Sequence, residues 1–346
     1  MSQAAPSPLV SVIVTCHNLG CYIGEAVQSV LAQTAQDFEI LIVDDGSDDQ
    51  QTKHLLEGSQ WPKTSVYRTE NQGLARARNF LIERARGTYL CALDADDRLR
   101  PQYFEKALSA FGQDPELAFV SSWIQMFGVE NRLWKQHSCD LATLLAEDTV
   151  MTAALVRRQL VAELGGYDGG MPAQGYEDWD LWIRIVGAGH RGTILPEMLF
   201  DYRRPNSMSA TCVQENTHLQ LVEYLMRKHH DLYASHWPTV LLRKETEIAD
   251  MLESNRRLER EILDRLTPFV DRAGHELAEV QRRLDPAVPQ GSQRMDQSSA
   301  LRAELVRAQG EVRALRHSWS WRVTRPLRWV VDLGEAVSTW TRRRDE

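Results

Sequence analysis

The chain has 346 residues, a formal net charge of −8 and a hydrophobic fraction of 43%. This length fits one large α/β domain with an appendage, or two domains, and the negative charge argues against a general nucleic-acid-binding protein. The five cysteines are scattered and form no CxxC pair, so we expect neither a disulfide framework nor a zinc site. No stretch reaches the roughly 18 apolar residues of a spanning helix, and the start lacks the regions of a signal peptide. We therefore expect a cytoplasmic protein, with any membrane contact peripheral, at the inner face of the cytoplasmic membrane.

The first 50 residues predict a strand-helix-strand unit with a polar edge. Residues 9–15 are a β-branched apolar run, residues 22–33 have helical apolar spacing, and residues 38–43 form a second apolar run. The second run ends in DDGSDD, and open parallel sheets bind ligands just outside the carboxyl ends of their strands. We expect Asp44 and Asp45 to contact a ligand, and Asp48 and Asp49 to cap the next helix.

The acidic motif LDADD at residues 93–97 follows the apolar run 88–92, which is expected to be another buried strand. Carboxylates packed this closely raise each other's pKa, and a hard divalent cation would relieve their repulsion. Taken alone, the motif fits either a metal-diphosphate clamp or a solvated acidic turn. Arg78 lies near the start of a predicted helix after NQG. It suits a phosphate, and an ordinary surface arginine is the alternative.

Four segments together carry a family resemblance: VSVIVTCHN, FEILIVDDGSDD, NQGLARARN and GTYLCALDADD, in this order. They resemble glycosyltransferase family 2 over about residues 8–205. The resemblance implies a GT-A fold, a Rossmann-like α/β nucleotide-diphospho-sugar transferase domain, and inverting transfer from a nucleotide diphosphate sugar. It implies nucleotide contacts at Thr15, Asn18, Asp44, Asp45, Arg78 and Asp94, and a divalent metal, Mn²⁺ or Mg²⁺, at Asp94 and Asp96.

The segment GYEDWDLWIR at residues 175–184 predicts a helix that begins near Asp178. Acids at its start would favour the helix dipole by about 0.3–1 kcal/mol, but an acceptor hydroxyl also needs a base to take its proton. The pattern resembles the family's acceptor-side segment, in which the aspartate of the ED pair is the base. This implies Asp178 as the general base, with Glu177, Trp179 and Asp180 as supports. His137, which has no evident partner, is expected to be an ordinary surface or core residue.

The chain departs from the family at residues 200–209, where many members have a histidine that helps to bind metal or phosphate and this chain has none. We expect Arg203 or Arg204 to supply positive charge to the diphosphate instead. A QxxRW segment and membrane spans, typical of processive synthases, are also absent from the sequence. Transfer of a single sugar is therefore expected rather than processive synthesis.

The C-terminal third changes composition to Glu, Arg and Leu from about residue 240. Heptad spacing at residues 248–269 and 301–315 predicts a coiled coil, and a helical hairpin packed on the enzyme is the alternative. The Trp- and Arg-rich end resembles a SWRxTxPLR segment of bacterial surface-polysaccharide transferases, and suits a membrane surface or a partner protein. We expect a disordered 1–8, a GT-A domain at 9–235, a helical region at 236–316 broken near 285–298, and an amphipathic tail at 317–346.

The predicted function is that of an EC 2.4 enzyme: an inverting glycosyltransferase that adds one sugar to a glycan or lipid-linked acceptor in cell-surface polysaccharide assembly. The alternative is a catalytically degenerate sugar-nucleotide-binding scaffold that acts through its coiled coil, as a homo-oligomer or with a partner. The presence of Asp45, Asp94, Asp96 and Asp178 favours the enzyme. A nucleotidyltransferase lacks support, because no Gly-rich, Lys-containing phosphate loop lies near the first strand.

Overall fold

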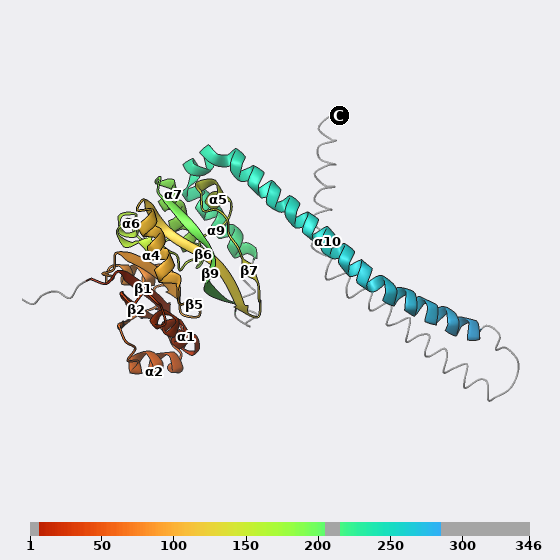
Figure 1. The fold of residues 1–346 in the computed structure, drawn as a ribbon, viewed down its shortest axis with the longest axis horizontal. Helices are drawn as coiled ribbons and strands as arrows, with labels where there is room; N and C mark the ends of the chain where they lie inside the picture. Colours follow the sequence, from red (N-terminus) through yellow and green to blue (C-terminus); the bar gives the residue numbers. More distant parts are fainter. Residues whose placement is uncertain (1–6, 205–214, 285–346) are drawn as a thin grey trace, which may run out of the picture. The chain divides into compact units, whose positions relative to one another are not determined.

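The computed structural model describes residues 7–204 and 215–284 (Figure 1). It divides into two compact units, one that ends at Glu247 and one that begins at Ile248. The first unit holds a nine-stranded sheet with its helices. Helix α10 (His230–Leu284) starts in the first unit and continues into the second. The predicted α/β domain with a helical C-terminal extension is therefore confirmed.

The sheet is mixed: one half is entirely parallel, and the other half combines antiparallel pairs with the parallel pair of β6 and β9. Its strand order is β3-β2-β1-β4-β8-β6-β9-β5, and β7 also pairs with β6. The parallel half contains β1 (Val10–Cys16), β2 (Phe38–Asp45), β3 (Thr64–Thr69) and β4 (Tyr89–Asp94). The other half contains β5 (Arg98–Leu99), β6 (Leu117–Gly128), β7 (Leu133–Trp134), β8 (Leu155–Arg157) and β9 (Arg191–Arg204). The direction changes at β8, which runs antiparallel to both β4 and β6.

The helices of the first unit follow the apolar spacing of the sequence. They are α1 (Gly20–Leu31), α2 (Gln50–Gly58), α3 (Leu74–Ile82), α4 (Tyr103–Gln113), α5 (Leu141–Ala146), α6 (Arg158–Glu163), α7 (Glu177–Gly187) and α9 (Glu215–Lys228). In α1 the predicted stripe is buried, because Ile23, Ala26, Val27 and Val30 are each 0% exposed. The helix begins two residues before the predicted start.

Two aspartates precede α2: Asp49 caps the helix, and Asp48 contacts a neighbouring loop. Asp49 is the N-cap, and its carboxylate accepts hydrogen bonds from the backbone N–H groups of Gln51 and Thr52 at 3.2 and 2.8 Å, as predicted. The prediction that Asp48 also caps the helix is wrong. Its carboxylate accepts from the Asn18 side-chain amide at 2.6 Å, because the loop after β1 comes close to the loop after β2.

The strand register brings polar strand ends to one edge of the sheet. Thr15, near the end of β1, pairs with Val43 of β2 and with Asp94 of β4. Gly46 then lets the chain turn away from β2. Its φ is +70°, and a Cβ there would lie 2.4 Å from the Asn71 backbone nitrogen. A side chain at this position would therefore push the loop after β3 away from the edge.

Helix α9 belongs to the packing of the first unit, since Leu221 and Leu225 are 2% and 0% exposed. In α10, the heptad residues Ile248, Met251 and Leu258 are 48%, 58% and 54% exposed, so the coiled coil stays a prediction. Within the described ranges, no helix combines the length and the apolar composition needed to cross a bilayer. The second heptad segment at 301–315, the predicted break and the Trp- and Arg-rich end lie outside the described residues.

Candidate active site

A cavity of about 280 Å³ lies at the carboxyl ends of β1, β2 and β4. Four residues expected from the sequence line it: Thr15, Asp45, Asp94 and Asp96. The remaining lining residues are Cys16, His17, Leu19, Asn71, Leu74, Ala95 and Gln174. The arrangement follows from the parallel register, because the three strands end at the same edge of the sheet.

Asp45 orders the loop that forms one wall of this cavity. Its Oδ1 accepts from the backbone N–H of Gln72 at 3.0 Å and from the Thr69 hydroxyl at 3.2 Å, and its Oδ2 accepts from the Gly73 N–H at 3.0 Å. The Asp45 side chain is buried, with the residue 5% exposed. The carboxylate thus fixes the turn before α3 as well as lining the cavity.

Asp44 and Asn18 do not line the cavity. Asp44 accepts a hydrogen bond from the Ser47 N–H at 2.9 Å and lies 3.7 Å from Arg68. The Asn18 amide oxygen accepts from the N–H groups of Asp48 and Asp49, both at 3.0 Å. Both side chains therefore hold the loops around the edge, and their nucleotide contacts remain predictions.

The acidic loop after β4 concentrates three carboxyl groups. Burial and the negative charge of Asp94 raise the pKa of Asp96 to about 6. Burial, with the charges of Asp94 and Asp96, raises the pKa of Asp97 well above its usual range. Asp97 is 1% exposed and accepts from the Arg203 N–H at 2.7 Å, so it anchors the loop to β9. Asp94 and Asp96 are the two that face the cavity.

Arg203, not Arg204, lies at this acidic loop. The Arg203 Nε donates to the Asp96 backbone carbonyl at 2.7 Å, and its guanidinium carbon stacks 4.6 Å from the centroid of the Tyr22 ring. Arg204 points elsewhere, since its Nε lies 3.4 Å from Glu130 and its side chain is 42% exposed. Of the two arginines named from the sequence, Arg203 is the one placed to influence the acidic loop.

Arg78 links the acidic loop to the helix that carries the predicted base. Its side chain is 2% exposed, its Nη2 donates to Asp94 Oδ1 at 2.7 Å, and its Nη1 donates to Glu177 Oε1 at 2.8 Å. The planar guanidinium group of arginine can bind two carboxylates in fixed directions at once, whereas the ammonium group of lysine imposes no such geometry. One buried side chain of α3 thereby joins β4 to α7.

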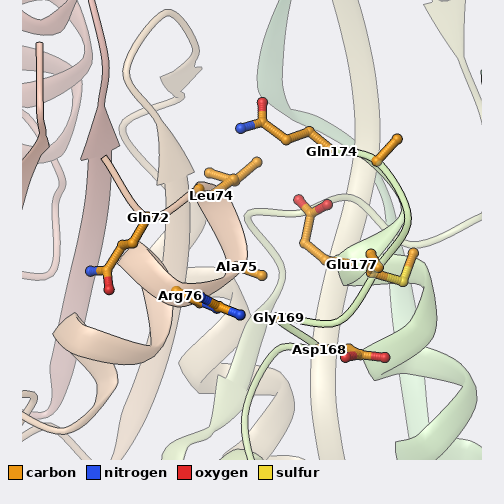
Figure 2. A pocket seen from close by; sticks show the side chains of 11 residues that line it. Gln72, Leu74, Ala75, Arg76, Asp168, Gly169, Gln174 and Glu177 are labelled. Carbon is orange, nitrogen blue, oxygen red and sulfur yellow. The ribbon is translucent and has the colours of Figure 1, made fainter. Parts of the chain in front are cut away.

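A second cavity, of about 220 Å³, lies beside the first and shares Leu74 and Gln174 with it. Figure 2 shows the residues of its two walls. One wall has Gln72 from the turn before α3 and Leu74, Ala75 and Arg76 from the start of α3. The other has Asp168, Gly169 and Gln174 from the segment before α7 and Glu177 from its first turn. The shared residues make the two cavities neighbours along the same edge. Glu177 of the predicted ED pair lines the second cavity.

Asp178 is held by two hydrogen bonds at the N-terminus of α7. Its Oδ2 accepts from the Thr152 hydroxyl, and its Oδ1 accepts from the Trp179 N–H at 2.9 Å. Asp178 is 9% exposed. Trp179 is 4% exposed and donates its indole N–H to the Leu144 carbonyl at 2.5 Å. Trp179 therefore fixes the start of α7 against α5, and the role of Asp178 as base remains a prediction.

Comparison with known proteins identifies a family and several relatives. Residues 11–164 match the family model described as glycosyl transferase family 2. An uncharacterized glycosyltransferase of Methanocaldococcus jannaschii is 26% identical over 211 residues, which cover 58% of this chain and 72% of the relative. A putative teichuronic acid biosynthesis glycosyltransferase of Bacillus subtilis is 43% identical over 106 residues, which cover 29% of this chain and 41% of the relative. Residues 11–164 therefore match a family 2 glycosyltransferase domain.

The fold of this family 2 domain is also seen in a solved structure. The crystal structure of S. aureus TarS 1–349 in complex with UDP-GlcNAc superimposes with a TM-score of 0.51 at 17% sequence identity, over 63% of this chain and 66% of that one. At this identity the likeness is one of fold, and it confirms the predicted GT-A architecture. The match spans less than half the length of the B. subtilis relative. The substrates and the reaction of this chain are therefore proposed below.

A buried charge network centred on Asp180 connects α7 to the end of α9 and to His229, which lies between α9 and α10. Asp180 is 0% exposed and accepts from Arg184 Nε, Lys228 Nζ and the His229 ring, each at 2.8 Å. Burial raises the pKa of Asp180, but hydrogen bonding by His229 and the charges of Arg184 and Lys228 outweigh burial and hold this pKa below its usual range. Asp180 therefore connects α7 to the end of α9 and the residue that follows it.

Replacing Asp180 with asparagine is expected to lower the free energy of unfolding by about 1–3 kcal/mol at neutral pH, since it leaves partly buried cations without their anion. A carboxyl group whose pKa is depressed on folding stabilises the protein above its unfolded pKa, and this contribution is lost as the pH falls. The difference between wild type and Asp180→Asn should therefore shrink below about pH 4. Urea unfolding at several pH values measures it, and a difference independent of pH would contradict the network's ionic character.

Several residues of the site belong to no sequence motif, and the sequence did not predict that they lie there. His17 lines the cavity and its Nδ1 lies 3.0 Å from the Asp45 carbonyl. Its position directly after the first strand was the one available signal. Gln174 and Thr152 come from segments without a periodic pattern, so only the folded chain places them beside Leu74 and Asp178.

The residues present fit a divalent cation that takes most of its ligands from a bound diphosphate. Within the described part of the chain, no group of three or more His, Cys, Asp or Glu side chains could hold a metal unaided. Mg²⁺ in such sites commonly binds one or two carboxylates together with substrate phosphates. Asp94 and Asp96 provide two carboxylates at the cavity, and Arg78 already occupies one oxygen of Asp94. Asp96 is therefore the better metal ligand of the two.

Proposed function

We propose that the family 2 domain transfers one sugar, with inversion, from a nucleotide diphosphate donor to an acceptor hydroxyl group. The observation that most supports this is the pair of hydrogen bonds from Arg78, at 2.7 Å to Asp94 and 2.8 Å to Glu177. Inverting transfer needs a group that stabilises the leaving diphosphate and a base for the acceptor on the other side of the sugar. Arg78 holds the acidic loop and the base helix in one fixed arrangement.

The donor is proposed to bind in the cavity at the strand ends. Thr15 and Asp45 line the part formed by β1 and β2, where the nucleoside would lie, and Asp94 and Asp96 would face the diphosphate. The cavity of about 280 Å³ is close to the lower end of the range of small-ligand sites, roughly 300–1,000 Å³. TarS, which shares the fold, is described in complex with UDP-GlcNAc, and this supports a nucleotide sugar as donor.

Asp96, with Asp94, would hold Mn²⁺ or Mg²⁺ against the donor diphosphate. When bound, the cation would neutralise the charge that develops on the departing nucleoside diphosphate. Arg203 keeps the Asp96 main chain in place through its 2.7 Å hydrogen bond to the carbonyl. Arg203 thereby keeps the Asp96 carboxylate at the cavity wall, where it can bind the cation.

Asp178 is proposed to be the general base. Its carboxylate, fixed by Thr152 and by the Trp179 N–H, takes the proton from the acceptor hydroxyl. The hydroxyl oxygen forms a bond to the anomeric carbon as the bond from that carbon to the diphosphate oxygen breaks. Attack opposite to the leaving group inverts the anomeric centre, and the proton remains on Asp178 until solvent removes it.

The acceptor is proposed to be a glycan or a lipid-linked sugar in cell-surface polysaccharide assembly. The B. subtilis relative is named for teichuronic acid biosynthesis, which supports this class. Contact of the C-terminal tail with the inner face of the membrane, and self-association or partner binding through α10, belong to the same proposal. A degenerate scaffold is less favoured, because the aspartates the chemistry needs are present and positioned.

The test is release of nucleoside diphosphate from a panel of nucleotide sugars: UDP-glucose, UDP-GlcNAc, GDP-mannose and dTDP-rhamnose, each with Mn²⁺. We expect release from one donor class, abolished by a chelator and stimulated by a glycan acceptor. Proton NMR of the product should show the inverted anomer. No release from any donor would contradict the proposed function and leave the scaffold as the better account.

A further inference from the structure

The second cavity adjoins both partners of the proposed reaction. It shares Leu74 and Gln174 with the cavity at the strand ends, and one of its lining residues, Glu177, directly precedes Asp178 in α7. None of the residues proposed to hold the nucleoside, the diphosphate or the cation lines the second cavity. A chemical group bound there would therefore lie beside the donor and beside the proposed base, and would belong to neither the nucleotide nor the metal.

Three charged side chains line this cavity, and one of them lacks an opposite charge. Asp168 accepts from Lys228 Nζ at 2.6 Å, and Glu177 accepts from Arg78 Nη1 at 2.8 Å. Arg76, the third, forms no hydrogen bond and no ion pair with any residue that the structure describes. Arg76 is also exposed, so a ligand can reach it. The cavity therefore presents a positive charge that the described part of the chain does not balance.

The loop before α7 leaves room for Arg76 at this cavity. A Cβ on Gly169 would lie 2.9 Å from Arg76 Cγ and 3.1 Å from Arg76 Nε. Figure 2 shows the Arg76 side chain extending from α3 toward Gly169. Gly169 is not among the glycines with a positive φ, so its backbone conformation does not by itself require glycine. The glycine instead permits the close approach of the arginine, whose side chain thereby lies at the cavity.

The ligand that suits Arg76 is an anion. A guanidinium group is always charged, and its planar fork matches the two oxygens of a carboxylate or phosphate group. Gln174, on the other wall, likewise forms no hydrogen bond within the described ranges, and its side-chain NH2 can donate to the same kind of oxygen. The donor diphosphate is not this anion, because Arg76 does not line the cavity in which the diphosphate is proposed to lie.

We propose that Arg76 is a specificity-determining residue, which binds a carboxylate or phosphate group on one of the two sugars of the reaction. The inference rests on the proposed function. Both sugars must meet near Asp178, and the second cavity reaches this point at Glu177. The substrate class is therefore an acidic sugar, a uronic acid or a sugar phosphate, either as the transferred unit or as the acceptor.

Two arms of one experiment distinguish the transferred sugar from the acceptor. The donor arm compares hydrolysis of nucleotide hexoses with hydrolysis of the corresponding nucleotide hexuronates, built on the nucleotide that the release assay identifies. The acceptor arm compares transfer to methyl hexosides with transfer to their uronic-acid and 6-phosphate counterparts. We expect wild type to prefer the acidic compound in one arm, and that arm identifies which sugar carries the anion.

Arg76→Met should lower the ratio of kcat/KM for the acidic compound to kcat/KM for the neutral one by about 10- to 100-fold, mainly through the KM of the acidic compound, because a charged hydrogen-bonding partner is lost. Arg227→Met is the matched control. Arg227 is an exposed arginine on α9 that pairs with Glu223 on its own helix and lines neither cavity. Gly169→Ala keeps the charge of Arg76 but displaces its side chain, so it should lower the same ratio at unchanged net charge.

A wild type without a preference for acidic compounds in either arm would overturn this inference, and so would an Arg76→Met variant that keeps the preference. In both cases the release of nucleoside diphosphate leaves the proposed function standing. A wild type that neither hydrolyses nor transfers any donor would overturn the proposed function, and this inference with it.

Discussion

Asp178→Asn is expected to lower kcat for sugar transfer by about 10²–10⁴-fold, the usual contribution of a general base. Asparagine keeps the shape of the side chain, and its amide oxygen can still accept from the Trp179 N–H, as Asp178 Oδ1 does. Its NH2 group takes the place of Oδ2 and can donate to the Thr152 hydroxyl oxygen, which reverses that hydrogen bond. The substitution removes the ability to take a proton. The loss should therefore appear in kcat, while the KM for the donor stays close to that of wild type.

Glu163→Gln is the control for this prediction. Glu163 is an exposed acid on α6 whose carboxylate accepts from Gln159 at 2.8 Å, so its replacement removes one negative charge far from the proposed chemistry. Steady-state kinetics with the identified donor measures both variants. A fully active Asp178→Asn enzyme would show that another group takes the acceptor proton.

Arg78→Met is expected to destabilise the family 2 domain by about 3–5 kcal/mol, the usual effect of removing one partner of a buried ion pair. Arg78 is 2% exposed, and its loss leaves Glu177, 6% exposed at the side chain, and Asp94 without their cation. Burial and the charge of Asp178 raise the pKa of Glu177, and Arg78 lowers it, so the loss of Arg78 should raise this pKa further. The start of α7 would lose its attachment to β4, and transfer activity should fall with stability.

Arg76→Met on the same helix is the matched control. Arg76 is exposed and shares the helix and the side-chain type of Arg78, so its replacement should change the free energy of unfolding by no more than about 0.5 kcal/mol. Urea unfolding followed by tryptophan fluorescence compares the two. Equal stability of the Arg76 and Arg78 variants would contradict the role of Arg78 as a link. Arg78→Lys should rescue the charge but not the two-sided geometry, and so recover stability only in part.

The edge of the sheet was predictable from sequence because it depends on local patterns. Apolar runs followed by acids place Asp45, Asp94 and Asp96 at strand ends, and parallel pairing brings those ends together. The exact use of each acid was not predictable. Asp44 and Asp48 lie close to Asp45 in the sequence, yet only Asp45 of the three lines the cavity. Asp44 and Asp48 bond to loop groups instead, because side-chain direction depends on the turn around Gly46.

The connections between distant segments were the part that sequence could not supply. Arg78 and Glu177 are 99 residues apart, and nothing local indicates their hydrogen bond. The loop that carries Asp148 and Thr152 has no apolar period, so its contact with Asp178 emerges only from packing. The same holds for Lys228 and His229, at the end of α9 and directly after it, whose bonds to Asp180 attach this part of the chain to α7.

The most direct test of the central claim, that the edge of the sheet binds a nucleoside diphosphate through Asp96, is a thermal-shift panel. UDP, GDP, dTDP and CMP are each added with and without Mn²⁺ to wild type and to Asp96→Ala. A ligand that binds only the folded state stabilises it by about 2.7 kcal/mol at a hundredfold excess over Kd. We expect one diphosphate to raise the melting temperature of wild type only with Mn²⁺, and to leave Asp96→Ala unchanged. No shift with any nucleotide, or an equal shift in both proteins, would contradict the account.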